Sequence, residues 1–297
     1  MIDKIRPRAL ASFLAAAAGL ALVFSSSAAL GGAWSQPDKG AYLKLSYGLS
    51  AAKDQYKDRG EVFPLLSEDI PGSFGAMGLY FYGEFGLMPR LTVFGSGAFQ
   101  RLELDSTFQT ARTTGVGDLT LGMRYQFVDM PAVVALSFAT KMPTGYSPDL
   151  EGMTPTLGNG VYEHDVRLLV GKSFYPLPIY TSGELGFRFR GERTTALGTV
   201  VDYSDEIPYS LEVGYGPTDW IWLRGVVNGV YGLGSPQALD IFSLSPTTQR
   251  YTKVGPSVIA SFGERYQVSV DYLYTVAGVN TVKSHDLILG LAITFGQ

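Results

Sequence analysis

Cysteine is absent from this chain of 297 residues, and histidine occurs only twice. Without cysteine the chain has no disulfides, no thiolate metal sites and no cysteine nucleophile. Two histidines alone do not supply the ligand cluster of a typical zinc site. We therefore expect no metal and no cofactor. A chain without thiols also fits export to an oxidising compartment.

Charged residues are scarce as well. They make up 17% of the chain, against about 25% in ordinary soluble domains. The formal net charge of −4 does not favour a nucleic-acid partner. No long apolar run explains the low charge, because no segment after residue 33 approaches the roughly 18 apolar residues of a transmembrane helix. The mature chain therefore contains no helical membrane span.

The N-terminus has the three parts of a secretory signal peptide. Basic residues lie within positions 4–8, an Ala/Leu-rich apolar core covers 9–24, and small residues follow up to Ala33. This core is shorter than the roughly 20 residues of a spanning helix, which favours cleavage over an uncleaved anchor. We expect residues 1–33 to be removed, with cleavage after Ala33 or, alternatively, after Ala29.

The rest of the chain, residues 34–297, alternates apolar and polar side chains in segments of about ten residues. In the clearest example Leu119, Leu121 and Met123 alternate with Thr120 and Gly122. Successive side chains of a strand point to opposite faces, so each segment predicts a strand with one apolar and one polar face. About twelve segments show this pattern, near residues 40–48, 76–86, 90–102, 116–127, 132–141, 162–172, 179–190, 207–215, 220–231, 254–262, 266–276 and 285–296.

The connections between these segments fall into two classes. Short ones carry turn residues at 87–89, 128–131, 173–178, 216–219 and 263–265. Longer ones, rich in Gly, Pro, Ser, Thr and Asp, lie at 49–75, 103–115, 142–161, 191–206, 232–253 and 277–284. Short turns on one side and long loops on the other are typical of outer-membrane barrels, which also have even strand counts.

The charged residues collect on the polar faces of the strands. In a soluble sandwich they would face solvent, whereas in a membrane barrel they must face the lumen. The signal peptide, the two classes of connection and the apolar faces without charges at mid-strand favour the barrel. We predict an all-β fold, a transmembrane antiparallel up-and-down β-barrel of about twelve strands, whose lumen is lined by Lys44, Glu84, Asp118, Arg124, Lys141, Arg167, Glu184, Arg188, Glu212, Arg224, Asp271 and Asp286.

Several motifs resemble one known family. They are TGVGDLTLGMRYQF at 114–127, KMPTG at 141–145, LGNG at 157–160 and GELGFRFRGE at 183–192. These motifs are similar to those of the outer-membrane proteins of the MetA-pathway-of-phenol-degradation family. The resemblance implies an outer-membrane barrel that passes small, often aromatic or apolar molecules. It carries over no catalytic residue.

The lumen and the loops leave alternatives open. The lumen charges either form a transverse field that orients solutes or pair with one another and fill the interior. The loop at 142–161 either folds into the mouth or, as the default, is a flexible surface loop. Residues 34–39 could form a plug. Trp220 and Trp222 follow a short turn and are expected at the water–lipid boundary.

We therefore predict an outer-membrane channel for small molecules, aromatic or hydrophobic ones among them. Its expected partners are membrane lipid, small-molecule solutes and the outer-membrane insertion machinery. This machinery reads a terminal aromatic residue in many barrels, and here Phe295 is displaced by two positions, which leaves its role open. No pattern indicates an oligomeric state. The alternative is a closed structural or adhesive barrel whose long loops bind a partner. An enzyme is not expected, because no Ser lies two residues from His164 or His285 as a barrel phospholipase requires.

Overall fold

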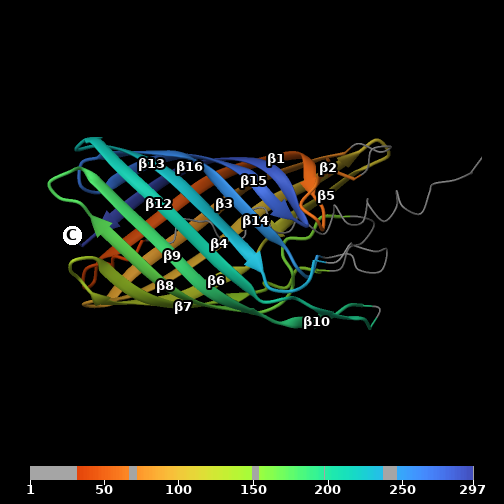
Figure 1. Ribbon diagram of the computed structural model, residues 1–297, viewed down its shortest axis with the longest axis horizontal. Helices are drawn as coiled ribbons and strands as arrows, with labels where there is room; N and C mark the ends of the chain where they lie inside the picture. The colour runs from red at the N-terminus through yellow and green to blue at the C-terminus, as the bar shows by residue number, and fades with distance from the viewer. Residues whose placement is uncertain (1–31, 67–71, 149–153, 197, 237–245, 297) are drawn as a thin grey trace, which may run out of the picture.

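The computed structural model describes residues 32–296 apart from 67–71, 149–153, 197 and 237–245. Consecutive strands pair antiparallel around the wall, and the last strand pairs with the first, which closes the sheet (Figure 1). The predicted fold class, an antiparallel β-barrel of twelve strands, is thereby confirmed. The predicted signal peptide falls almost wholly outside the described residues, and no described helix is long and apolar enough to cross a membrane.

Twelve wall strands are described. They are β1 (Ala41–Tyr56), β3 (Gly72–Met88), β4 (Leu91–Ser106), β6 (Leu119–Val128), β7 (Val133–Met142), β8 (Glu163–Ser173), β9 (Ile179–Arg190), β12 (Glu206–Thr218), β13 (Ile221–Gly232), β14 (Arg250–Phe262), β15 (Tyr266–Val279) and β16 (Thr281–Phe295). Four short strands lie at the long-loop end: β2 (Val62–Pro64), β5 (Thr110–Val116), β10 (Glu192–Thr194) and β11 (Val200–Asp202).

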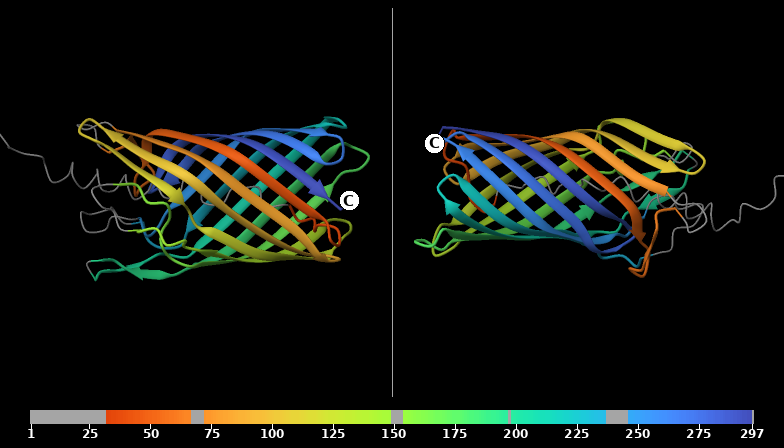
Figure 2. Two further views of the ribbon diagram at one scale, coloured as in Figure 1. Left: turned by 180° about the vertical axis from the view of Figure 1, so that it is seen from behind. Right: turned by 90° about the horizontal axis from the view of Figure 1, so that it is seen from above.

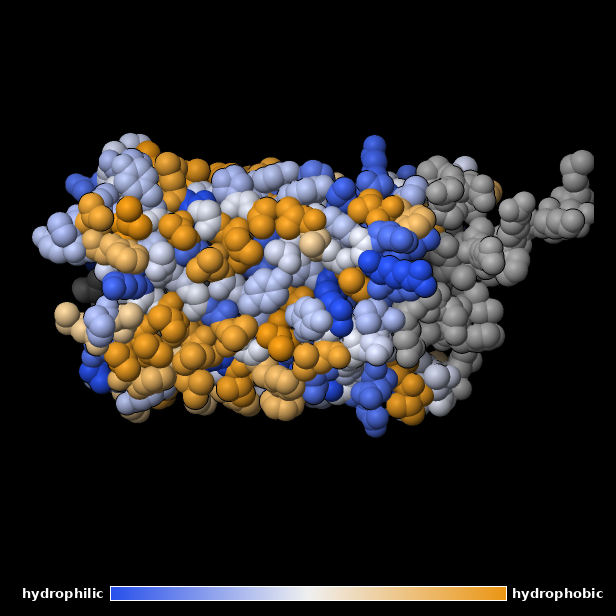
Figure 3. All heavy atoms as spheres, viewed as in Figure 1, coloured by the Kyte–Doolittle hydropathy of each residue, from blue (hydrophilic) through white to orange (hydrophobic). Residues whose placement is uncertain are grey.

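The wall is apolar outside and polar inside. Where β1 meets β16, Leu43 faces Ile293 and Leu45 faces Leu291 in register, and their side chains point outward. Their neighbour Ser46 points inward and is buried. Figure 3 shows hydrophobic side chains spread over the middle of the wall, with strongly hydrophilic ones gathered toward the long-loop end. The alternation in the sequence therefore separates a lipid-facing surface from a lumen.

The two ends of the barrel differ. Short turns and both described termini lie at one end, here called the inner end, and the longer connections lie at the other, the outer end (Figure 2). Outer-membrane barrels place short turns on the periplasmic side and long loops outside the cell. Some predicted loops proved to be strand: β1 continues to Tyr56, and β15 and β16 meet at a tight turn on Asn280.

These longer strands have a physical reason. Backbone hydrogen bonds between antiparallel neighbours continue beyond the lipid layer, where outward side chains are no longer required to be apolar. Asn280 has a φ of 51°, a left-handed conformation that Asn tolerates and that tight β-hairpin turns require. The predicted loop at 277–284 was therefore wrong, and so was the part of the 49–75 loop that β1 occupies.

The outward face of β16 offers a direct test of the lipid-facing assignment. Leu289 points outward near the middle of the wall, and its neighbour Ile288 lines the lumen. Leu289→Arg should lower the free energy of unfolding by roughly 2–4 kcal/mol, because it places a charge in hydrocarbon. Ile288→Arg should cost less than half as much. Urea titration of the barrel refolded into vesicles measures both, and equal costs would contradict the assignment.

Candidate functional site: the barrel lumen

The lumen contains a large cavity with a volume of about 620 Å³, whose lining extends from Trp34 and Ser173 at the inner end to Tyr251 near the outer end. This volume suits a small organic molecule, since ligand sites commonly enclose about 300–1,000 Å³. Nine of the twelve wall strands line it, all except β4, β6 and β7, so it belongs to the barrel interior and not to a surface groove. Its lining combines ion-paired side chains with aromatic rings, among them Tyr42, Tyr82, Tyr180 and Trp222.

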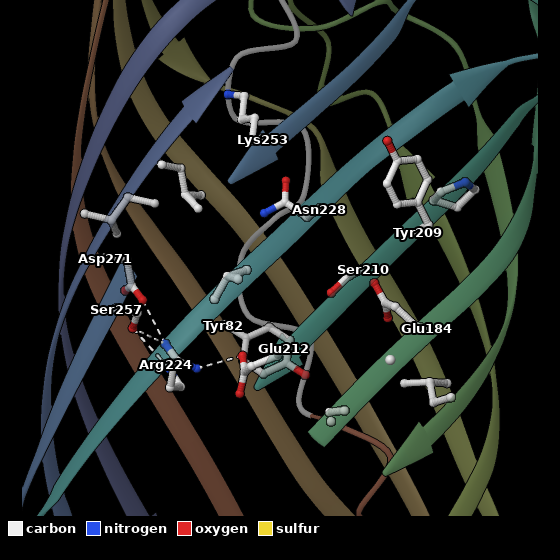
Figure 4. Close-up of a pocket in the computed structure, with 18 of the residues that line it drawn as sticks. Tyr82, Glu184, Tyr209, Ser210, Glu212, Arg224, Asn228, Lys253, Ser257 and Asp271 are labelled. Atoms are coloured by element: carbon white, nitrogen blue, oxygen red, sulfur yellow. Dashed lines mark hydrogen bonds and ion pairs between the residues drawn. The ribbon is translucent and has the colours of Figure 1, made fainter. Parts of the chain in front are cut away.

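Arg224 of β13 organises one side of this cavity (Figure 4). Its guanidinium donates to Glu212 of β12 at 3.1 Å, to Asp271 of β15 at 2.8 Å and to the hydroxyl of Ser257 at 2.6 Å. Lys44 of β1 lies 3.8 Å from the same Asp271. Four strands thus share one charge cluster, and the carboxylates that face the cavity are neutralised.

A larger ion-pair network lies toward the outer end. Arg188 of β9 contacts Asp165 of β8 at 2.7 Å and Glu206 of β12 at 3.0 Å. Arg167 bridges Asp165 at 2.5 Å and Glu184 at 2.8 Å. These groups are nearly inaccessible to solvent, and a buried charge requires such partners because its desolvation is costly.

The same network continues to the rim. Lys141 of β7 lies 2.9 Å from Glu163 and 3.3 Å from Asp118. Both β5 and β6 pair with β4, and Asp118 lies in the short gap between them. On the opposite wall Lys253 pairs with Asp286 at 2.5 Å.

The twelve sequence-predicted lumen residues therefore all lie on the inner side of the wall, in four groups. One group is Lys44, Glu212, Arg224 and Asp271; the second is Asp118, Lys141, Arg167, Glu184 and Arg188; the third is Glu84 with Arg124; and Asp286 pairs with Lys253. Of the two alternatives, pairing is what the structure contains, yet the pairs stay close to the wall and leave the cavity between them.

The N-terminal segment before β1, residues 32–40, enters the lumen at the inner end. Trp34 meets Tyr180 edge to face, with ring centroids 6.1 Å apart, and covers Gly171 of β8, where a Cβ atom would lie 2.7 Å from its ring. Ala33 is fully buried against Val133 and Leu169. Because β1 lies on the far side of the barrel from β8, the segment crosses the lumen and narrows its inner end.

One buried ion pair holds this segment. Arg124 of β6 lies 3.0 Å from Glu84 of β3 and donates to the backbone carbonyl of Trp34 at 2.9 Å. Gln36 donates to the same carboxylate at 2.7 Å, and the hydroxyl of Tyr82 also donates to it. Both charges are 1% exposed, so the pair and the segment depend on each other.

The outer end is narrowed by apolar side chains. Leu65 and Leu66, which follow β2, are fully buried against inward-facing Phe74, Leu102 and Leu104 of β3 and β4. Leu66 has a φ of 81°, a conformation that costs a branched residue about 1–2 kcal/mol. The packing of the side chain offsets this cost. The apolar cluster therefore narrows the lumen at the outer end, as the N-terminal segment does at the inner end.

The loop between β7 and β8 also folds into the mouth. Leu157 belongs to the apolar cluster, and its carbonyl accepts a hydrogen bond from Gln100 at 3.3 Å. Tyr146 donates to Asp118 and accepts from the backbone of Gly160 at 3.1 Å. The default expectation of a flexible surface loop was wrong for its described residues, because apolar and hydrogen-bonding groups anchor them inside.

Sequence reasoning missed the aromatic part of the cavity. Trp222 was expected at the water–lipid boundary, but it shares the inward parity of Arg224, and its ring lies 5.3 Å from that of Tyr180. Tyr42 and Tyr82 likewise share the parity of Lys44 and are 6.4 Å apart. Their positions in the alternation, on the same face of the strands as the charged residues, could have predicted that these rings line the lumen.

Both histidines lie on the lipid-facing side of the wall, not on its lumen side. His164 is within 3.0 Å of the Thr140 hydroxyl, and His285 is within 2.6 Å of the Tyr272 hydroxyl. They therefore take no part in the lumen. Within the described ranges, no group of three His, Asp or Glu side chains has the arrangement of a metal site.

A closed barrel with an apolar outside, a charged inside and one-sided long loops defines a transmembrane β-barrel of the outer-membrane type. The chain belongs to the family described as "Putative MetA-pathway of phenol degradation", whose profile matches residues 62–289. Among proteins with curated descriptions, none matches the chain.

Solved structures with the same fold are membrane barrels. The COG4313 outer membrane channel from Pseudomonas putida F1 superposes with a TM-score of 0.69 at 15% identity, covering 88% of this chain and 97% of that one. The NanC porin reaches 0.52 at 8% identity, covering 84% and 98%. The translocator domain of the autotransporter NalP from Neisseria meningitidis reaches 0.50 at 11% identity, covering 88% and 90%.

The Glu84–Arg124 pair provides a stability test. Arg124→Met leaves Glu84 buried without its cation, and we expect a loss of about 3–5 kcal/mol in the free energy of unfolding. The matched control is Arg90→Met at the inner rim, because the Arg90–Asp129 pair is about half exposed and such pairs contribute about 0–1 kcal/mol. Urea titration in vesicles compares them. Equal losses would show that burial does not decide the strength of the pair.

Proposed function

We propose that the protein is a passive channel of the outer membrane for small molecules that carry both an apolar or aromatic part and a polar part. The observation that carries this proposal is the cavity of about 620 Å³, lined on the same walls by paired charges and by aromatic rings. Family membership and the shared fold of a known outer membrane channel support it.

The chemistry of the cavity favours amphipathic solutes. The rings of Tyr180 and Trp222 offer apolar surface, and Arg224 with Glu212 offers a hydrogen-bonding edge a few residues away. Because the charges are already paired, a bound solute neither leaves a charge without a partner nor forms a strong ion pair of its own. Weak binding of this kind allows release, which passage through a channel requires.

Passage leads past a constriction at each end. At the inner end the solute must pass Trp34, and at the outer end it must pass Leu65 and Leu66, which are packed with no exposed surface. An apolar barrier of this kind opposes fully hydrated solutes, such as inorganic ions and sugars, more than it opposes solutes with an apolar part. The twelve lumen residues named from the sequence would tune passage by setting the shape and polarity of the path.

The narrowed outer mouth also favours the second candidate, a structural or adhesive barrel whose loops bind a partner. Both candidates are non-catalytic. Contacts with membrane lipid and reading of Phe295 by the insertion machinery stay predictions for either.

Electrical recording in planar bilayers tests the channel. The wild-type barrel should conduct weakly, and Trp34→Gly should raise the conductance severalfold because it removes the largest side chain of the segment that crosses the inner end. Trp220→Gly is the matched control, since Trp220 lies on the outer wall beside a short turn and is 52% exposed. Its conductance should equal that of the wild type.

A solute-uptake assay completes the test. Liposomes holding the barrel should take up benzoate faster than a neutral sugar of similar size, because only benzoate presents both chemistries. No conductance from either wild type or Trp34→Gly, together with no uptake above protein-free liposomes, would contradict the channel and leave the adhesive barrel.

A further inference from the structure

One group of outward-facing side chains breaks the apolar pattern of the wall. On β16 the outward positions read Phe295, Ile293, Leu291, Leu289 and Leu287 and then change to His285 and Lys283. On the two flanking strands the change occurs at the same level: Tyr272 and Tyr274 of β15 face β16 on one side, and Lys53 of β1 lies on the other.

This level is the outer membrane surface. At a rise of roughly 3.3 Å per residue and a tilt of about 40°, the path from Phe295 to His285 covers roughly 25 Å. That is the height of the apolar band of an outer-membrane barrel, which ends in a girdle of aromatic rings. Tyr272 and Tyr274 belong to this girdle, so His285, Lys283 and Lys53 lie beside lipid head groups and not beside acyl chains.

The four side chains of β15 and β16 form a connected patch. The hydroxyl of Tyr272 lies 2.6 Å from Nδ1 of His285, and the rings of Tyr274 and His285 are 4.5 Å apart. The ammonium of Lys283 lies 5.9 Å from the ring centroid of Tyr274. Because Nδ1 is engaged by Tyr272, Nε2 is the ring nitrogen of the exposed His285 that is left for a ligand.

The positive charge of this patch is less fully compensated than the charges of the lumen. Within the part of the chain that the structure describes, neither Lys53 nor Lys283 forms an ion pair within 4 Å; Lys283 interacts with the Tyr274 hydroxyl and, at longer range, with the carboxylate of Asp54, which stands opposite it in the β1–β16 register. Lys53 is exposed and lies at the register shift between Ala52 and Asp54, which turns it outward. Two ammonium groups and an imidazole therefore remain available for an anion at the surface.

We infer that Lys53, Lys283 and His285, with the rings of Tyr272 and Tyr274, bind the phosphorylated sugar head group of one lipopolysaccharide molecule in the outer leaflet. The ammonium groups match the phosphate charge, Nε2 of His285 and the tyrosine hydroxyl reach sugar or phosphate oxygens, and the apolar wall below, Leu287 and Leu289, accepts the acyl chains. The site lies on the outside of the wall, so it is independent of the proposed channel.

Native mass spectrometry of the full barrel released from detergent tests this inference. Bisphosphorylated lipid A is titrated against the wild type and against a variant with Lys53→Gln, Lys283→Gln and His285→Gln. We expect one tightly retained lipid A on the wild type and at least a tenfold weaker affinity in the variant. Lipid A without phosphate and phosphatidylglycerol should both bind the wild type at least tenfold more weakly than the bisphosphorylated form.

Lys172→Gln is the matched control. Lys172 also points outward beside an aromatic ring, 5.3 Å from the centroid of Phe174, but at the inner end of the wall. Its affinity for lipid A should equal that of the wild type. Unchanged heat resistance of the barrel on gels confirms that each variant is folded. The inference is overturned by unchanged binding in the triple variant, by equal loss in Lys172→Gln, or by a preference for phosphatidylglycerol.

Discussion

The structure depends on one constraint: inside hydrocarbon every backbone amide and carbonyl must have a partner within the protein. A sheet satisfies it only when it has no free edge, and here the pairing of β16 with β1 removes the edge. Closure then fixes the direction of every side chain, because the two faces of the sheet become outside and inside. The alternation of the sequence acquires its meaning from this closure.

Enclosing the polar face has an electrostatic consequence. Arg188, Arg224 and Lys253 lie where bulk water is largely excluded, and each has carboxylate partners within about 3 Å. Their pairing keeps them against the wall, so the centre of the lumen stays open for a solute. The ion pairs thus shape the cavity more than they stabilise the fold, since replacing a buried pair by apolar residues is often neutral.

Much of this was predictable from the sequence, because strand alternation is a local property. The twelve strands and the inward direction of Lys44 or Asp271 follow from period-two patterns within about ten residues. The segments that narrow the two ends of the lumen do not follow from such local patterns. Arg124 meets Trp34 across 90 positions of the chain, and Leu157 joins a cluster with Leu65 and Leu102 that no local pattern connects. Trp222 was misplaced because its ring suits either the girdle or the lumen, and parity with Arg224 was the better guide.

The most direct test of the central claim uses the absence of native cysteine. Single cysteines placed at each position from Trp222 to Asn228 of β13 would be reacted, in outer-membrane vesicles, with a small charged thiol reagent that does not enter lipid. The account predicts reaction at 222, 224, 226 and 228, which line the cavity, and protection at 223, 225 and 227. Uniform reactivity along the strand, or faster reaction at the odd positions, would contradict a barrel with its apolar face in lipid and its polar face enclosed.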